Sequence, residues 1–289
     1  MKPVRKAIFP VAGFGTRFLP ATKAVPKEML PVVDRPLIQY AVDEARAAGI
    51  EQMIFVTGRN KYAIEDYFDS AYEIESDLAA KNKTEFLDRL EATRLTPGHA
   101  AFIRQQQMLG LGHAVACARD LVGDEPFAVL LPDELLWNPA SPCLQQMVET
   151  YEAKGGNVVA VLEVPEEHTH RYGIVDPGMS EGAVTEVRRM VEKPAAGTAP
   201  SRLAIVGRYI LQPEIFALLD KGERGAGGEI QLTDAMAKLI GTQPFHALTF
   251  DGERHDCGDN AGFIQANIAL ALERPELRES IQAFIKTLV

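Results

Sequence analysis

The segment from residue 10 to residue 31 constrains this chain more than any other. It follows a short apolar run, residues 7–11, and carries two closely spaced glycines, Gly13 and Gly15. Glycines let backbone amides approach a ligand closely, and successive amides can form an anion-binding nest. Three later prolines stiffen the segment and keep it out of helices and sheets. The segment therefore predicts a rigid binding loop at the end of a buried strand.

The charge distribution indicates what this loop binds. Residues 1–27 contain six Lys or Arg and no Asp or Glu. The whole chain has 30 basic and 40 acidic residues, so the remainder has 24 against 40, a net charge of −16. A basic loop on an otherwise acidic protein favours a small polyanion, most simply phosphate groups. The acidic balance argues against nucleic acid as a partner.

Two familiar phosphate-binding motifs do not match this loop. The P-loop requires Gly-x-x-x-x-Gly-Lys followed by Ser or Thr, and no such string occurs. The dinucleotide fingerprint requires a third glycine where Phe18 stands, and Asp34 does not end the strand expected over residues 52–57. A lone Gly-x-Gly is equally consistent with an ordinary turn, but Arg17, Lys27 and the prolines weaken that interpretation.

Length and composition fit one large α/β domain, or a domain with an appendage, in a chain of 289 residues. The three cysteines are an odd count without paired spacing, which predicts a reducing compartment and no disulfide framework. No signal peptide is apparent, and no apolar run approaches the ~18 residues that span a bilayer. We therefore expect a cytoplasmic enzyme with no membrane partner.

Strand-like and helix-like segments alternate as far as residue 164. This order predicts a Rossmann-like α/β fold, a mostly parallel twisted sheet flanked by helices. The charged stretch 72–93 is expected to form a helical excursion on the surface. Three later strand-like segments with short links predict an antiparallel elaboration at the edge of the sheet. The expected strands are 52–57, 101–104, 127–131, 158–164, 171–176, 183–192, 203–211 and 245–250, and the expected helices include 36–48, 61–68, 142–154, 230–240, 260–272 and 275–288.

Polar residues follow two of these strands. The apolar strand 127–131 ends in Asp133, and ligands of open α/β sheets bind beyond the carboxyl ends of strands. Asp133 could hold Mg²⁺ against phosphates, although a loop acid or helix cap is a common alternative. The strand 101–104 runs into Gln105 and Gly110, where an amide could read a base edge. By itself, a glycine turn beside solvated glutamines would be favoured there.

The string Ala-Gly-Phe-Gly-Thr-Arg-Phe-Leu-Pro-Ala-Thr-Lys-Ala-Val-Pro-Lys-Glu-Met-Leu-Pro, residues 12–31, resembles the signature of the sugar-nucleotide pyrophosphorylases. Within them it is most similar to the bacterial UTP–glucose-1-phosphate uridylyltransferases. The resemblance spans nearly the whole chain, and its departures are conservative, such as Phe14 in place of a smaller or aliphatic residue. It implies a single nucleotidyltransferase domain over residues 1–289, divided into a nucleotide-binding core (1–164), a sugar-binding elaboration (165–260) and C-terminal helices (261–289).

The resemblance also implies substrates and residue roles. UTP and glucose 1-phosphate would give UDP-glucose and pyrophosphate. Mg²⁺ would lie on Asp133 and Asp256. Arg17 and Lys27 would bind the β- and γ-phosphates, and Lys193 would hold the sugar phosphate. Uridine would contact Ala12, Gly13, Gly15, Gln105 and Gly110, with Gln106 and Gln107 left open as alternatives to Gln105, and glucose would contact Gly173, Glu192, Ile205 and Tyr209.

This chemistry explains why no Ser-His-Asp or Cys-His set is needed. The second pKa of a phosphate monoester is about 6, so glucose 1-phosphate is largely dianionic at neutral pH and needs no general base. Three alternatives stay open. A dTTP-using thymidylyltransferase differs by one methyl group on the base, worth only ~1–3 kcal/mol. A nicotinamide-dependent oxidoreductase is the second, although this chain lacks the third glycine of the dinucleotide fingerprint. A catalytically silent sugar-nucleotide sensor is the third, although it would not need the complete set of proposed acids and cations.

Two further expectations concern the C-terminal part of the chain. Asp259 is a candidate cap for the helix at 260–272. The final helix, 275–288, is amphipathic and is either a dimer contact or a helix packed on the core. By analogy with the family we expect a homo-oligomer, a dimer or a tetramer.

Overall fold

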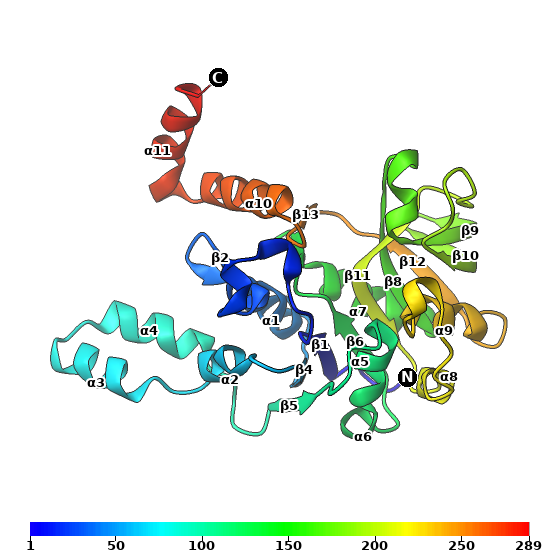
Figure 1. Cartoon of the computed structure of the whole chain (residues 1–289), viewed down its shortest axis with the longest axis horizontal. Coiled ribbons are helices and arrows are strands. Elements are labelled where there is room, and N and C mark those ends of the chain that lie inside the picture. Colours follow the sequence, from blue (N-terminus) through cyan, green and yellow to red (C-terminus); the bar gives the residue numbers. More distant parts are fainter. Residues whose placement is uncertain (289) are drawn as a thin grey trace.

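The computed structural model describes residues 1–288. Its centre is a mixed sheet whose nine strands lie in the order β5-β4-β1-β6-β11-β8-β12-β10-β9, with helices on both faces (Figure 1). The strands are β1 (Lys6–Pro10), β4 (Gln52–Thr57), β5 (Ala100–Arg104), β6 (Phe127–Leu130), β8 (Asn157–Glu163), β9 (Gly173–Glu181), β10 (Val184–Glu192), β11 (Leu203–Leu211) and β12 (Phe245–Thr249).

Successive side chains of the central strands point to opposite faces of the sheet and pack into two separate hydrophobic cores. In β1, Ile8 packs into the core formed with α5, α8 and α9, while Phe9 packs into the core formed with α1 and α7. Strands covered on both faces need apolar side chains at every position, which explains the unbroken apolar runs in the sequence. The helices on the two faces are α1 (Leu37–Ala47), α2 (Tyr62–Phe68), α5 (Leu111–Cys117), α6 (Arg119–Val122), α7 (Cys143–Lys154), α8 (Ile215–Leu219) and α9 (Leu232–Leu239).

The predicted α/β class is confirmed, with one correction to the position of a strand. β1 pairs in parallel with β4 and β6, and β4 pairs in parallel with β5, as expected. The prediction that β11 lies at the sheet edge is wrong, because β11 is inserted antiparallel between β6 and β8. From Ala204 onward every residue of β11 is buried, the pattern of a central strand, and only β9 and β10 extend the edge.

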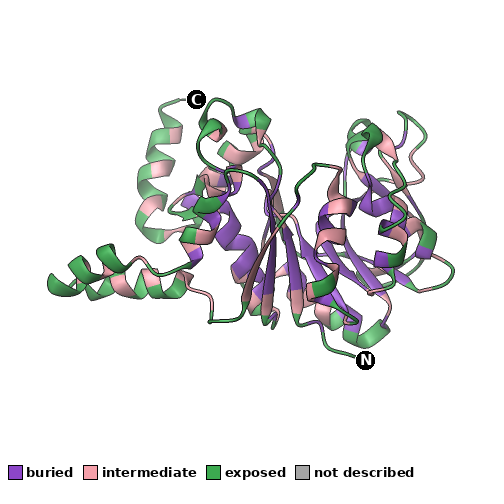
Figure 2. Cartoon of the chain, turned by 60° about the horizontal axis from the view of Figure 1, so that its bottom comes forward, coloured by how far each residue is buried: buried purple, intermediate pink, exposed green. Residues whose placement is uncertain are grey.

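Two helical pairs project from this body (Figure 1). α3 (Tyr72–Ala80) and α4 (Thr84–Thr93) contain no buried residue, which confirms the predicted surface excursion. Asp259 caps α10 (Asn260–Glu273) by accepting a 2.9 Å hydrogen bond from the Gly262 amide, as expected. α11 (Pro275–Lys286) contains no buried residue either, so the interpretation of the last helix as a core element is wrong (Figure 2).

Two pairs of short strands were not predicted from the sequence. β2 (Pro31–Val32) pairs with β3 (Arg35–Pro36), and β7 (Glu134–Trp137) pairs antiparallel with β13 (Glu253–Asp256). The second pair sets Glu134 opposite Asp256. It therefore brings the end of β6 beside a segment more than 100 residues away in the sequence. None of the helices within residues 1–288 has the length and apolar character needed to cross a membrane.

Candidate active site

The glycine-bearing loop after β1 is folded back on itself by three short 3₁₀ turns: η1 (Thr16–Phe18), η2 (Ala21–Lys23) and η3 (Lys27–Met29). Gly15 has a φ of +64°, and a Cβ atom on it would lie 3.0 Å from the Cβ of Lys27. The Thr22 hydroxyl donates a 2.7 Å hydrogen bond to the Gly15 carbonyl. Gly15 is therefore required by backbone conformation and by space, because the loop brings Lys27 against its own beginning.

Lys27 forms the ion pair that joins this loop to the end of β6. Its Nζ atom lies 2.5 Å from Oδ2 of Asp133, and both side chains are mostly buried. Burial disfavours both charges, but the mutual attraction is larger in sum: the pKa of Lys27 is raised and that of Asp133 is lowered. Both groups are consequently charged at neutral pH, at the carboxyl end of the sheet.

Arg17, Asp133 and Asp256 surround the position that a side chain on Gly258 would occupy. A Cβ atom on Gly258 would lie 2.9 Å from Asp256 Oδ1, 3.3 Å from Arg17 Nη1 and 3.5 Å from Asp133 Oδ2. Arg17 also donates a 3.2 Å hydrogen bond to the Gly258 carbonyl, and the Gly258 amide donates to Asp256 Oδ1 at 3.0 Å. Two predicted metal ligands and one predicted phosphate ligand therefore surround a space that a side chain would fill.

These residues open into a cavity of about 430 Å³ that also holds the predicted sugar-binding residues. A Cβ atom on Gly173 would lie 2.9 Å from Thr233 Oγ1 and 3.2 Å from Glu192 Oε2, so this wall of the cavity requires glycine. Lys193 Nζ lies 3.3 Å from Glu192 Oε1. Eight of the predicted site residues line this one cavity: Arg17, Asp133, Gly173, Glu192, Lys193, Ile205, Tyr209 and Asp256.

Gln105 borders a second hollow, of about 770 Å³, which Phe14 and Met108 also line. Its side chain is buried, whereas Gln106 and Gln107 are exposed. The Gln105 Nε2 atom donates to the Gly110 carbonyl at 3.1 Å. The structure therefore fixes the orientation of Gln105 and leaves the side chains of its two neighbours in solvent.

Two more predicted residues, Gly110 and Ala12, make close contacts with neighbouring segments. Gly110 has a φ of +107°, and a Cβ atom there would lie 2.7 Å from the Cβ of Glu229. Ala12 is buried, and its carbonyl would lie 2.9 Å from a Cβ on Gly58. Gly13 is exposed, and a Cβ on it would meet no atom within 4 Å. The protein fold thus explains the glycine at 110, whereas no protein atom excludes a side chain at position 13.

Several residues of the cavity were missed by sequence reasoning. Arg171, Tyr172, Thr233 and Glu134 line it, and Arg254 lies behind Glu134. Burial raises the pKa of Glu134 to about 7 in spite of the adjacent Arg254. Two of the five, Tyr172 and Glu134, stand next to a predicted residue in the sequence, but the role of all five depends on contacts that chain order does not reveal.

The carboxylates of the cavity suit an Mg²⁺ ion whose remaining ligands come from substrate and water. Among residues 1–288 no group of three or more His, Cys, Asp or Glu side chains is placed to hold a metal. Asp133 and Asp256 nevertheless face the same space beside Gly258. Mg²⁺ is usually held by one or two carboxylates together with substrate phosphates and water, so a pair of carboxylates in a basic cavity is sufficient.

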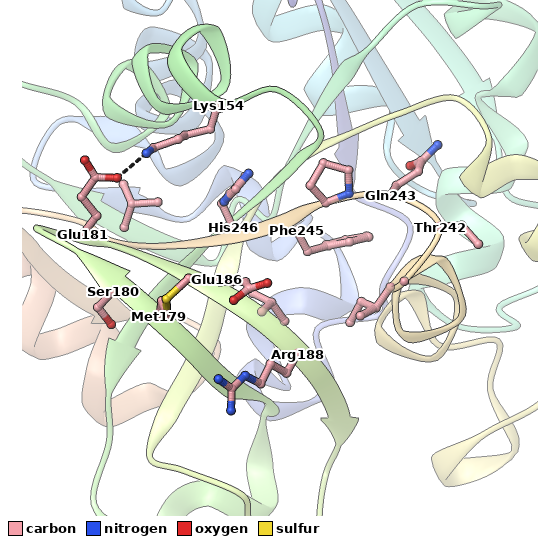
Figure 3. A pocket seen from close by; sticks show the side chains of 15 residues that line it. Lys154, Met179, Ser180, Glu181, Glu186, Arg188, Thr242, Gln243, Phe245 and His246 are labelled. Atoms are coloured by element: carbon pink, nitrogen blue, oxygen red, sulfur yellow. Dashed lines mark hydrogen bonds and ion pairs between the residues drawn. The ribbon is translucent and has the colours of Figure 1, made fainter.

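A larger groove lies away from these residues (Figure 3). It measures about 800 Å³ and is lined by the far ends of β9 and β10, by β12 and by the loop before it. Lys154 pairs with Glu181 at its rim. No predicted site residue lines this groove, since Gly173 and Glu192 lie at the opposite ends of β9 and β10.

The sequence matches the nucleotidyl transferase family model over residues 6–273, and the chain belongs to that family. It is 53% identical to the UTP–glucose-1-phosphate uridylyltransferase of Bacillus subtilis, over the whole of this chain and 98% of the relative. It is 50% identical to the protein of the same name from Staphylococcus epidermidis, over all of this chain and 99% of the relative. The resemblance read from residues 12–31 is thereby confirmed.

Solved structures agree with this assignment. A UTP-bound UDP-glucose pyrophosphorylase from Acinetobacter baumannii is 43% identical, with a TM-score of 0.90 over 99% of this chain and all of the other. A UDP-glucose pyrophosphorylase complexed with UDP-glucose is 44% identical, with a TM-score of 0.85 over 94% of this chain and all of the other. A Bacillus anthracis structure described as a glucose-1-phosphate thymidylyltransferase is 22% identical with a TM-score of 0.68, which shows a shared fold alone.

Proposed function

We propose that this protein is a nucleotidyltransferase that makes UDP-glucose and pyrophosphate from UTP and glucose 1-phosphate. The observation that carries the proposal is the single cavity in which Arg17, Asp133 and Asp256 face Lys193 and the predicted sugar-binding residues. The names of the relatives and of the solved structures support the same substrates. The remoter thymidylyltransferase resembles this chain only in fold.

The reaction brings two polyanions together, so the protein must position them and neutralise their charge. Glucose 1-phosphate, already dianionic, attacks the α-phosphorus in line. Lys193 holds the attacking phosphate, while Arg17 and Lys27 bind the β- and γ-phosphates and stabilise the pyrophosphate that leaves. Mg²⁺, when bound by Asp133 and Asp256, would supply further positive charge against the phosphates.

Gln105 gives a physical basis for choosing the base. Because its Nε2 atom donates to the Gly110 carbonyl and also lies 3.0 Å from His113 Nδ1, both N–H groups have partners and its Oε1 atom is the group left for a ligand. An amide oxygen can accept a hydrogen bond from N3–H of uracil, and cytosine has no hydrogen at that position. Glucose would contact Gly173, Glu192, Ile205 and Tyr209, and uridine would also contact Ala12, Gly13 and Gly15.

The test is pyrophosphate release with Mg²⁺ and glucose 1-phosphate, measured in parallel with UTP, dTTP, CTP, ATP and GTP. Release with UTP far above the other nucleotides is expected. Faster release with dTTP would keep the fold and the mechanism but replace the activity by a thymidylyltransferase. Release with none of the five would contradict the proposed function.

A homo-oligomer, dimer or tetramer, and a cytoplasmic location belong to the same proposal. α11 supports the first, because it has no buried residue, and Phe284 on it and Leu288 two residues beyond its end are 60% and 68% exposed. Apolar side chains gathered on an exposed helix usually mark a contact with another protein surface. Light scattering during size-exclusion chromatography tests the oligomer, and a monomeric mass would refute it.

A further inference from the structure

We propose that Arg254 is a positioning residue that fixes the two metal-side carboxylates and Lys193 in one geometry. The inference rests on the proposed function, because it concerns groups that would hold the metal and the sugar phosphate. Arg254 does not line the cavity itself. It lies behind the cavity wall and acts through Glu134, Tyr172 and Asp256, which do line it.

On the metal side, Arg254 joins β13, which ends in Asp256, to the start of β7, which Asp133 directly precedes. Its Nε and Nη2 atoms donate to the two carboxylate oxygens of Glu134 at 2.7 and 2.8 Å. Such a fork-to-fork pair fixes orientation as well as distance. Glu134 directly follows Asp133, and Arg254 stands two residues before Asp256, whose Oδ2 lies 3.6 Å from its Nη2. One side chain therefore contacts Asp256 directly and the residue next to Asp133, so it links the two segments that bear the predicted metal ligands.

On the sugar side, Arg254 reaches Lys193 through Tyr172. The Arg254 Nη1 atom donates to the Tyr172 hydroxyl at 3.3 Å, and the guanidinium lies 5.1 Å from the centre of the tyrosine ring. The Tyr172 carbonyl in turn accepts a 3.0 Å hydrogen bond from the Lys193 amide.

Lys193 has a φ of +45°, which is uncommon for a residue other than glycine. Its backbone needs support to keep that conformation, and the bond to the Tyr172 carbonyl supplies it. Tyr172 also directly precedes Gly173, the close-packed wall of the sugar pocket. A shift of the tyrosine would therefore move both Lys193 and Gly173.

Only arginine can make this set of contacts. The side chain of Arg254 is 13% exposed and that of Glu134 is 15% exposed, so water replaces a lost bond poorly. Lysine would keep the charge but has no planar fork and stacks weakly on an aromatic ring. Arg254→Lys therefore removes the geometry while retaining the cation, and Tyr172→Phe removes only the link toward Lys193.

The matched control is Arg202→Lys. Arg202, which directly precedes β11, also pairs with a glutamate, Glu163 at the end of β8, but both side chains are more than half exposed and outside the cavity. We expect Arg254→Lys to raise the KM for glucose 1-phosphate and the Kd for Mn²⁺ about tenfold each, the loss of one charge-assisted hydrogen bond. At saturating Mg²⁺ the KM for UTP should change less than about twofold, because the proposed uridine contacts are at Gln105, which Arg254 does not touch.

Kinetics give the two KM values, and the electron paramagnetic resonance signal of free Mn²⁺ gives the metal affinity without turnover. Tyr172→Phe should raise the KM for glucose 1-phosphate and leave Mn²⁺ binding unchanged, and the control should change neither. Two results would overturn the inference. The first is an unchanged KM for glucose 1-phosphate and an unchanged Kd for Mn²⁺ in Arg254→Lys. The second is an equal rise of the KM values for glucose 1-phosphate and UTP together with a lower Tm, which would indicate a general loss of stability. If the wild type releases no pyrophosphate, the proposed function fails, while Mn²⁺ binding still tests the effect on the aspartates.

Discussion

Replacing Lys27 by alanine should reduce turnover strongly while the fold is retained. In the free protein Lys27 is 2.5 Å from Asp133, at the carboxyl end of the sheet. In the reaction it is proposed to bind the phosphates that leave as pyrophosphate. The change thus removes one charged donor from the place where negative charge develops.

The expected magnitude follows from this position. Removing a single preorganised donor to a developing anion costs about 10²–10³ in kcat. Asp133 would also lose its counter-ion. The two side chains are 20% and 27% exposed, so solvent screens part of that loss, and we expect a destabilisation of about 1–3 kcal/mol.

The assay is pyrophosphate release at saturating Mg²⁺, UTP and glucose 1-phosphate, with thermal unfolding followed in parallel. Lys23→Ala is the matched control, since Lys23 lies in the same loop and is exposed. The control should keep kcat within about twofold, because a solvated charge is screened. Turnover of Lys27→Ala within threefold of wild type would refute the role given to Lys27.

Three further predictions concern the rest of the cavity. Asp256→Asn should raise the Mg²⁺ concentration for half-maximal rate about tenfold, and an unchanged Mg²⁺ titration would remove Asp256 from the metal site. Gly173→Ala should raise the KM for glucose 1-phosphate more than that for UTP, because its Cβ would meet Thr233 and Glu192; equal changes in steady-state kinetics would contradict this. Asp133→Asn should destabilise the protein at pH 7. Because pairing with Lys27 lowers the pKa of Asp133, its stabilisation is present above the ordinary value of 3.8 and is lost as pH falls through the lowered value. Denaturant titrations should show the difference shrinking in acid, and a constant difference would oppose it.

Local sequence patterns were sufficient for most strands and helices. The bounds of β4 agree with the expected residues 52–57, because the apolar run is bounded by polar residues and a glycine. The place of β11 in the sheet was not accessible in this way. Strand order depends on which edges pair, and the chain from β8 to β11 passes first through the edge strands β9 and β10.

In the candidate site, too, some residues could be assigned from the sequence and others only from the fold. The roles given to Lys193 and Glu192 came from the family resemblance, because a Glu-Lys pair before proline carries little physical information alone. Arg254 and Glu134 meet only because β7 and β13 pair, and strands of four residues leave no periodic signal. The space beside Gly258 depends likewise on three segments that are remote in the sequence.

The most direct test of the account uses glucose 1-phosphate whose phosphate oxygens carry ¹⁸O. Attack of this phosphate on the α-phosphorus of UTP should place all the label in UDP-glucose and none in pyrophosphate. The isotope shifts in the ³¹P NMR spectrum distinguish the two products. Labelled UDP-glucose with unlabelled pyrophosphate is the expected result. Label in pyrophosphate, or no UDP-glucose formed from UTP, would contradict uridylyl transfer at this site.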